Sequence, residues 1–311
     1  MIDEIRFDGR TVVITGAGSG LGRAHARLLA RRGAHVVVND LDETAATATA
    51  DEISASGGLS TAVPADVATP EGASRVVDRT IETTGRLDGL VNNAGLLRAA
   101  DFDEMTFELF EQMIRVNLHS VFHMTRAAWP HMRSAGFGRI VSTTSNSGLL
   151  GTAGSTGYAS AKAGIWGFTR SLALEGASLG INVNAIAPIA YTPTSMNSRV
   201  APPSWRSGAG DPWARQLDPA RVAPVVAWLL HHECTMSGRT ISVAGGMATT
   251  FSMTNNHGFD VFEHGLDELT PEHTRDLEHL LLDTSDRPVE HANSALEGRA
   301  VHRRLMRRDR T

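Results

Sequence analysis

The sequence predicts an α/β fold in which a doubly wound parallel sheet is covered by helices on both faces. Short β-branched runs alternate with longer helical stretches over the first 245 residues, a spacing typical of βαβ units. The strand candidates are continuous apolar runs, as expected for strands that are buried on both faces. A chain of 311 residues, 41% hydrophobic and 20% charged, suits one large domain or two small ones.

The candidate elements follow one another in strict alternation up to the last strand. Strands are expected at residues 11–15, 35–39, 61–64, 89–92, 139–143, 181–185 and 240–243, which gives a sheet of about seven strands. Helices are expected at residues 21–32, 42–56, 70–84, 107–133, 157–178 and 219–231. We therefore assign residues 1–250 to one domain.

Two segments interrupt this alternation. Residues 190–218 are rich in proline and show little periodicity, which is typical of a lid or binding loop. The lid offers possible apolar walls for a substrate in Tyr191, Met196, Trp205 and Trp213, which can equally pack the lid onto the body. Residues 251–311 form an extension that we expect to be helical, because Thr270-Pro271 resembles a helix start and a second helix is expected at 292–306. We expect the extension to pack on the body or on a neighbouring subunit.

The composition argues against several classes of protein. A net charge of -5 is unlike that of a nucleic-acid-binding protein, which usually has a basic face. Cys234 is the only cysteine, which is consistent with a reducing compartment, and no apolar run is long enough to span a membrane. We expect a cytoplasmic protein without a metal site.

A glycine-rich turn follows the first strand candidate and opens the first helix candidate. It runs Thr15-Gly16-Ala17-Gly18-Ser19-Gly20-Leu21-Gly22. Glycines let the backbone turn tightly and let a pyrophosphate approach, and the helix N-terminus offers unpaired N–H groups to the phosphates. In this position the turn predicts a dinucleotide site, with Gly16, Ser19, Gly20 and Leu21 as cofactor-binding residues.

Asp40 follows the second strand candidate, 24 residues after Gly16. An acidic side chain there can accept hydrogen bonds from both hydroxyls of an adenine ribose, and it would repel a 2′-phosphate. No arginine stands at Ser19 or directly after Asp40, where a 2′-phosphate would need one. We therefore expect NAD as the cofactor. The other role open to Asp40 is that of a helix N-cap.

Lys162 is the only lysine of the chain, and it lies four residues after Tyr158. At helical spacing the two side chains share one face. A nearby ammonium is expected to lower the pKa of the phenol, which would suit Tyr158 to exchange a proton with an alcohol oxygen. Ser145 follows the fifth strand candidate, and its hydroxyl can hold the same oxygen as charge develops.

These motifs resemble those of the short-chain dehydrogenase/reductase family over residues 6–246. The matching residues are Thr15-Gly16, Gly20, Gly22, Asp66-Val67, Asn92-Asn93-Ala94-Gly95, Asn117, Ser145, Tyr158 and Lys162. The resemblance implies a Rossmann-type sheet and hydride transfer with a nicotinamide cofactor. It also implies that Asp66 and Val67 flank the adenine, that Asn93, Ala94 and Gly95 line the cofactor channel, and that Asn117 supports a proton relay to Lys162. Lys162 would also hold the nicotinamide ribose.

Within the family, the chain is similar to the 3-hydroxyacyl-CoA dehydrogenase part of peroxisomal multifunctional enzyme type 2. The similarity rests on residues 6–10, 36–41, 125–129 and 222–229. The chain departs from the family where Pro188-Ile189 replaces the usual Pro-Gly after the sixth strand. By position, Pro188, Ile189 and Thr192 are then the expected cofactor contacts in this segment.

The expected function is NAD-dependent interconversion of a secondary alcohol and a ketone, with Tyr158 as general acid/base. The resemblance favours a bulky hydrophobic substrate, such as a 3-hydroxyacyl-CoA or a hydroxysteroid, and a homodimer or homotetramer. A 3-oxoacyl-carrier-protein reductase-like enzyme and a non-enzymatic NAD-binding sensor are the alternatives. The exact alcohol, the physiological direction and the choice between dimer and tetramer stay open at this point.

Overall fold

The computed structural model describes residues 4–196, 216–256, 261–264, 268–282 and 289–290. The chain divides into two compact units, Met1–Thr250 and Phe251–Thr311. Most of the expected lid, including Trp205 and Trp213, lies outside the described residues. The helix expected at 292–306 lies outside them as well.

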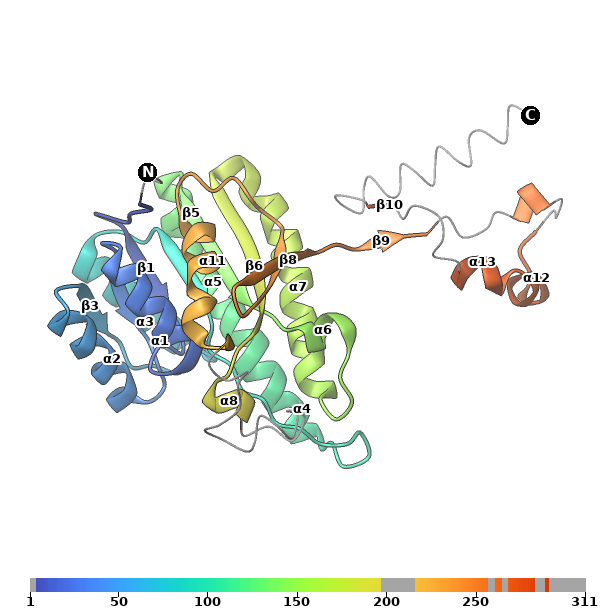
Figure 1. Ribbon diagram of the computed structural model, residues 1–311, viewed down its shortest axis with the longest axis horizontal. Helices are drawn as coiled ribbons and strands as arrows, with labels where there is room; N and C mark the ends of the chain where they lie inside the picture. Colours follow the sequence, from blue (N-terminus) through green and yellow to red (C-terminus); the bar gives the residue numbers. More distant parts are fainter. Residues whose placement is uncertain (1–3, 197–215, 257–260, 265–267, 283–288, 291–311) are drawn as a thin grey trace. The chain divides into compact units, whose positions relative to one another are not determined.

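The first unit is built on one sheet of eight strands in the order β3-β2-β1-β4-β5-β6-β7-β8 (Figure 1). The strands are β1 (Thr11–Ile14), β2 (His35–Val38), β3 (Leu59–Ala62), β4 (Gly89–Asn92), β5 (Gly138–Thr143), β6 (Ile181–Ile189), β7 (Thr240–Ala244) and β8 (Met247–Phe251). The pairs from β3 to β7 are all parallel. The sequence predicts about seven strands, and β8 is the additional one. It was missed because its residues are almost all exposed, so it has no buried apolar run.

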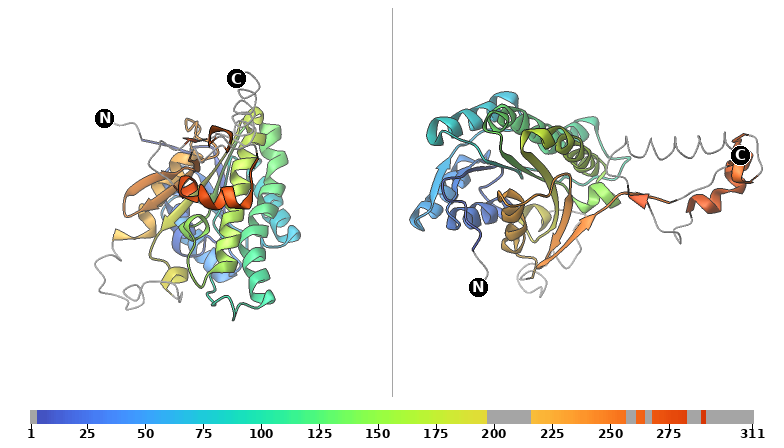
Figure 2. Two further views of the ribbon diagram at one scale, coloured as in Figure 1. Left: turned by 90° about the vertical axis from the view of Figure 1, so that its right-hand side faces the viewer. Right: turned by 90° about the horizontal axis from the view of Figure 1, so that it is seen from above.

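Helices cover both faces of this sheet, as the sequence predicts (Figures 1 and 2). They are α1 (Gly20–Arg31), α2 (Glu43–Ala55), α3 (Pro70–Thr84), α4 (Phe107–Ile114), α5 (Ser120–Ala135), α6 (Asn146–Leu150), α7 (Thr156–Gly176), α8 (Pro193–Met196) and α11 (Ala223–Leu230). Alternate residues of one strand enter different halves of the core. In β1, Val12 packs in a cluster with side chains of α1 and α11, and Val13 packs in a cluster with side chains of α3 and α5.

The strand order places a ligand site at one end of the sheet. The chain proceeds outward from β1 to β3, and then crosses to β4 on the other side of β1. Ligands of open parallel sheets bind outside the carboxyl ends of the strands at such a reversal point. The glycine turn after β1 and Asn93 after β4 both lie at this point.

The long helix expected at residues 107–133 is divided in the structure. A π-helix, η1 (Arg115–His119), separates α4 from α5. Asn117 lies within it, and its side-chain Nδ2 donates to the carbonyl oxygen of Met113 at 2.9 Å, a group four residues earlier in the chain. Single π turns inside helices are often found at functional sites. The apolar pattern of the sequence does not distinguish this turn from a continuous helix.

The second unit contains short elements only. They are β9 (Thr254–Asn255), η4 (Val261–His264), α12 (Pro271–Asp276), α13 (Glu278–Leu282) and β10 (Val289–Glu290), and β9 pairs with β10 in antiparallel fashion. Thr270 is the N-cap of α12, because its hydroxyl accepts from the backbone N–H of His273 at 3.2 Å. This helix start is the one that Thr270-Pro271 indicates in the sequence.

The buried His25 in α1 is expected to make the stability of the protein depend on pH. Its side chain is 1% exposed, neither ring nitrogen has a hydrogen-bond partner among the described residues, and burial lowers its pKa to about 3. Since the unfolded chain takes up this proton near pH 6.5, stability is lost as the pH falls from 6.5 towards 3, by at most about 1.4 kcal/mol per pH unit. Urea unfolding at pH 6.5, 5.5 and 4.5 should show a shallower loss for His25→Leu than for the wild type.

The exposed His279 provides the control for this measurement. His279→Leu removes one histidine without removing a buried one, so its pH dependence should match that of the wild type. An equal slope for His25→Leu and the wild type would show that His25 does not make the protein acid-sensitive.

Candidate active site

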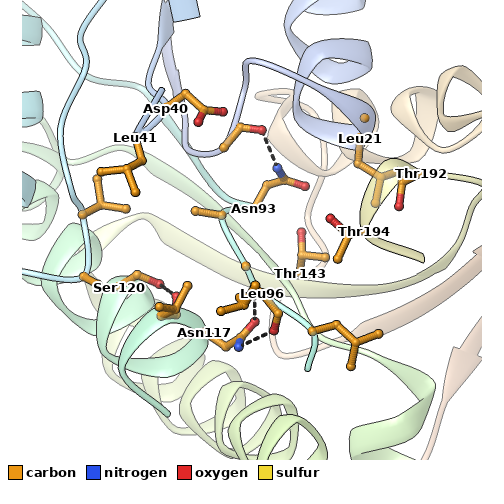
Figure 3. A pocket seen from close by; sticks show the side chains of 18 of the residues that line it. Leu21, Asp40, Leu41, Asn93, Leu96, Asn117, Ser120, Thr143, Thr192 and Thr194 are labelled. Carbon is orange, nitrogen blue, oxygen red and sulfur yellow. Dashed lines mark hydrogen bonds between the residues drawn. The ribbon is translucent and has the colours of Figure 1, made fainter. Parts of the chain in front are cut away.

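A cavity of about 510 Å³ lies at the reversal point of the sheet and collects nearly all the expected site residues. Figure 3 shows side chains that line it. Of the expected residues it is lined by Gly16, Ser19, Gly20, Leu21, Asp40, Asp66, Val67, Asn93, Ala94, Gly95, Asn117, Ser145, Tyr158, Lys162, Pro188 and Thr192. The exception is Ile189, which pairs with Ala244 in the sheet and does not line the cavity.

The glycine turn is shaped so that a ligand can approach its backbone. Gly16 has φ +62°, and a Cβ there would lie 2.9 Å from the Cα of Ala94. A Cβ at Gly22 would collide with the carbonyl oxygen of Gly16, so α1 can begin this close to the turn only with glycine. Asn93 holds the turn by donating from Nδ2 to the carbonyl oxygens of Thr15 at 3.0 Å and Gly16 at 3.1 Å. The turn and the first residues of α1 line the cavity, which fits a pyrophosphate.

Asp40 lies beside the glycine turn. Its Oδ2 accepts from the N–H of Gly18 at 2.9 Å, and its Oδ1 accepts from the N–H of Asp42 at 3.1 Å. The N-cap of α2 is Asp42, whose Oδ1 accepts from the N–H of Ala45 at 3.2 Å. The alternative role of Asp40 as helix N-cap is therefore taken by Asp42, and the Asp40 carboxylate lines the cavity.

Asp66 and Val67 line the same end of the cavity as Asp40. Asp66 accepts from the N–H of Ala68 at 3.0 Å and forms an ion pair with Arg115 at 3.3 Å. Arg115 was not predicted to belong to the site, because an arginine within a helix has no sequence signal of its own until the π turn places it. The other lining residues that were not predicted are Asn39, Leu41, Ala65, Ala68, Leu96, Leu97, Gln112, Val116, Ser120, Thr143, Thr144, Ala190, Pro193 and Thr194.

Tyr158, Lys162 and Ser145 come together at the other end of the cavity. The first two lie on α7, and the Lys162 Nζ is 5.6 Å from the centre of the Tyr158 ring. Ser145 follows β5 and lines the cavity together with Tyr158, and its Oγ donates to the Asn146 Oδ1 at 3.3 Å. The Lys162 side chain is 3% exposed, and its Nζ donates to the carbonyl oxygen of Thr143 at 2.7 Å. The helical spacing thus places the phenol and the ammonium together, as the sequence predicts.

The direction of the Tyr158 pKa differs from the sequence-based expectation. Burial raises the pKa of Tyr158, and the nearby Ser145 hydroxyl lowers it only in part. Burial also lowers the pKa of Lys162 to about 7. The expectation of a lowered phenol pKa was wrong because it counted the neighbouring ammonium and not the loss of water around both groups, which disfavours their charged forms.

Asn117 connects the π turn to the chain after β4. Its Nδ2 donates to the carbonyl oxygen of Leu96 at 2.8 Å, and its Oδ1 accepts from the N–H of Leu96 at 3.1 Å. A Cβ at Gly95 would lie 2.8 Å from this Oδ1 and 3.5 Å from the Lys162 Nζ. Asn117 therefore fixes the backbone at Gly95 and Leu96, and Gly95 lies close to both the Asn117 and the Lys162 side chains. Its proposed part in a proton relay remains a prediction.

The segment after β6 lines the cavity beside the glycine turn. A Cβ at Gly20 would lie 3.5 Å from the Thr192 side chain, which places Thr192 next to the turn. Thr194, two residues later, also lines the cavity (Figure 3). Ala190 lines the cavity in place of Ile189, because successive residues of an extended chain point to opposite sides.

Within the described part of the chain, no group of three or more His, Cys, Asp and Glu side chains is placed to hold a metal ion. No helix in that part is both long and apolar enough to cross a membrane.

The fold and the site are shared with known proteins. The family description "short chain dehydrogenase" matches residues 10–204. A short-chain type dehydrogenase/reductase of Mycobacterium tuberculosis is 42% identical over 258 residues, which cover 80% of this chain and 87% of that protein. Peroxisomal multifunctional enzyme type 2 of Mus musculus is 38% identical over 285 residues, which cover 89% of this chain but 37% of the mouse protein. A crystal structure of a short chain dehydrogenase from Mycobacterium avium has a TM-score of 0.76 at 35% identity and covers 91% of this chain and 97% of that chain.

Fold, site and relatives together define an oxidoreductase that acts on CH–OH groups. The chain belongs to the short-chain dehydrogenase family. Members of this family typically use a nicotinamide dinucleotide, and the glycine turn and the cavity beside it fit such a group.

Proposed function

We propose that this protein is an NAD-dependent oxidoreductase that interconverts a secondary alcohol and a ketone. The observation that carries the proposal is the convergence of Ser145, Tyr158 and the buried Lys162 in a cavity that Asp40 also lines. A phenol near a hydroxyl and a buried amine suits proton exchange with an alcohol oxygen. When bound, the dinucleotide supplies the acceptor for the hydride that leaves the alcohol carbon.

The residues of the chain perform the proton chemistry. Ser145 hydrogen-bonds the substrate oxygen and orients it towards the Tyr158 hydroxyl. Tyr158 takes the hydroxyl proton during oxidation and returns it during reduction. Lys162 is held by the Thr143 carbonyl oxygen next to the phenol, where its charged form stabilises the phenolate. We propose that Lys162 also holds the nicotinamide ribose and that Asn117 supports the delivery of protons to Lys162.

NAD is proposed over NADP because of Asp40. Replacing Asp40 with Ser removes the carboxylate that would repel a 2′-phosphate, together with two acceptors for the ribose hydroxyls. We expect kcat/KM with NAD to fall by about tenfold or more, as for the loss of hydrogen bonds to a charged group, and kcat/KM with NADP to rise. Steady-state kinetics with both dinucleotides measure this change.

Asp42→Asn is the matched control for this substitution, because it changes the charge two residues away and keeps an N-cap for α2. Its ratio of kcat/KM for NAD over NADP should equal that of the wild type. An Asp40→Ser protein with an unchanged ratio would show that Asp40 does not select the cofactor.

The proposed substrate is bulky and hydrophobic, of the 3-hydroxyacyl-CoA or hydroxysteroid type. It is supported by the apolar side chains of Leu96 and Leu97, which line the cavity, and by the similarity to peroxisomal multifunctional enzyme type 2. The proposed substrate class is tested by comparing the rates of NADH formation with a 3-hydroxyacyl-CoA, a hydroxysteroid and cyclohexanol. Preference for cyclohexanol would contradict the bulky substrate, and dinucleotide binding without turnover of any substrate would favour a binding role.

We further propose a homodimer or homotetramer in the cytoplasm. The assembly is suggested by the family, and the compartment by Cys234, which is a buried free cysteine. Residues 1–250 are proposed as the dinucleotide-binding domain with its lid at 190–218, and residues 251–311 as an extension that packs on the body or on a neighbouring subunit.

A further inference from the structure

The chain between β4 and the middle of α4 is acidic and is tied to the catalytic end of the cavity. It begins with Leu96 and Leu97, which line the cavity. The N–H of Ala100 donates to the carbonyl oxygen of Gly154 at 3.0 Å, shortly before Tyr158 in the chain. Residues 96–111 contain one arginine, at position 98, and five exposed carboxylates, which are Asp101, Asp103, Glu104, Glu108 and Glu111.

Two of these carboxylates lie next to the cavity itself. Glu108 and Glu111 line a surface depression of about 540 Å³ together with Gln112 and Arg115. Gln112 and Arg115 also line the cavity, so the depression and the cavity share a wall. Arg115 is paired with Asp66 at 3.3 Å, so a carboxylate already balances its charge. The negative charge of Glu108 and Glu111 therefore stands beside the cavity.

The neighbouring segments do not offset this charge. Residues 146–156, which follow Ser145, and residues 190–196, which follow β6, contain no Asp, Glu, Lys or Arg in their sequence. Together with residues 96–111 we call them the substrate rim. The rim exposes large apolar side chains instead, since Phe102 is 78%, Phe107 72% and Leu150 74% exposed. Apolar side chains of this size beside a cavity suit contact with an apolar ligand.

We propose that the acidic part of the substrate rim, residues 96–111, selects against alcohols that carry phosphate groups. The substrate is then an uncharged, bulky and apolar alcohol and not a CoA thioester. This inference rests on the proposed function and chooses between the two substrate types named there. CoA has three phosphate groups, with about four negative charges at neutral pH. Carboxylates beside the cavity lower the local concentration and the association rate of such an anion, and they do not repel a neutral alcohol.

The test compares two substrates that differ in their phosphate groups. A 3-hydroxyacyl-CoA and the N-acetylcysteamine thioester of the same 3-hydroxy acid share the reacting carbon, and only the first has phosphates. NADH formation by the full-length protein is followed at saturating NAD. The kcat/KM should be about tenfold or more higher for the N-acetylcysteamine thioester, within the range of electrostatic effects on association.

Ionic strength provides a second measurement on the same protein. Raising it from about 0.02 M to about 0.5 M should increase kcat/KM for the CoA thioester, because salt screens the repulsion. The value for the N-acetylcysteamine thioester should stay unchanged. The sign of the salt effect reports the net charge that the substrate meets, whichever residues supply it.

The double variant Glu108→Gln, Glu111→Gln assigns the effect to the rim. It should raise kcat/KM for the CoA thioester about threefold to tenfold and weaken its dependence on salt. The N-acetylcysteamine thioester should react within about twofold of the wild-type rate, since it meets no repulsion. Asp78→Asn with Glu82→Gln is the matched control, because it removes two exposed carboxylates from α3, which does not line the cavity. This control should change neither substrate.

Several results would overturn the inference. They are a kcat/KM for the CoA thioester that equals or exceeds that of its partner, and a kcat/KM that falls as salt is added. Equal gains in both double variants would assign the effect to the total charge of the protein. Rejection of both thioesters alike would show that phosphates do not decide. A wild type that binds NAD and oxidises neither these compounds nor a hydroxysteroid would instead overturn the proposed function, so the two failures are distinguishable.

Discussion

Replacing Tyr158 with Phe is expected to lower kcat by about 10²-fold to 10⁴-fold, the range typical of a lost general acid–base. The substitution removes only the phenol oxygen of a residue that lines the cavity together with Ser145 and Lys162. The ring stays in place on α7, so the shape of the cavity should be preserved. Turnover of the best alcohol, followed by NADH absorbance, measures the effect.

Binding of the dinucleotide is the internal control for this variant. Because Ser145 and Lys162 are unchanged, Tyr158→Phe should bind NAD within a few-fold of the wild type and should melt at a similar temperature. Turnover that stays within tenfold of the wild type would remove Tyr158 from the proton chemistry and would leave the proposed mechanism without its acid–base group.

Lys162→Arg is expected to lower kcat/KM by about 10²-fold or more, although it conserves the charge. The Lys162 Nζ lies 2.7 Å from the carbonyl oxygen of Thr143, and a Cβ at Gly95 would be 3.5 Å from it. A planar guanidinium needs more room than this ammonium has. It also stays protonated, whereas burial lowers the pKa of Lys162 to about 7. Steady-state kinetics and NAD titration measure the loss in catalysis and in binding separately.

Lys162→Met is the partner variant for this experiment, since it keeps the unbranched stem and removes the charge. Circular dichroism shows whether each variant is folded before its activity is compared. If the shape of the site matters, Lys162→Arg should bind NAD no better than Lys162→Met. An arginine variant that retains more than a tenth of wild-type kcat/KM would show that charge alone suffices at this position.

The sequence was sufficient for the main features of the fold because these depend on local patterns. The continuous apolar strands predicted a parallel sheet, and the order of β1 to β7 confirms it. The glycine turn was recognisable because only glycine tolerates the close approach at Gly16 and Gly22. By contrast, β8 has no buried face, and the π turn at Asn117 leaves the apolar spacing of its helix intact. Neither feature has a pattern that the sequence analysis could detect.

The candidate site likewise contains some residues that the sequence predicts and others that only the structure reveals. Asp40, Tyr158 and Lys162 were predicted from their distance to a motif along the chain. Arg115, Ala190 and Thr143 were not, because each reaches the cavity only through the path of the backbone around it. The cavity contact expected at Ile189 is made by its neighbour Ala190, because successive side chains of an extended chain point to opposite sides.

The sequence by itself determined the fold class and brought Tyr158 and Lys162 together in the candidate site, because helical spacing places them on one face of α7. The tertiary structure alone decided the electrostatic state of that pair. Burial is the combined effect of many residues from distant parts of the chain, and it opposes charge on both groups. It raises the pKa of Tyr158 and lowers the pKa of Lys162, so the phenol has a higher pKa than the spacing of the two residues predicts.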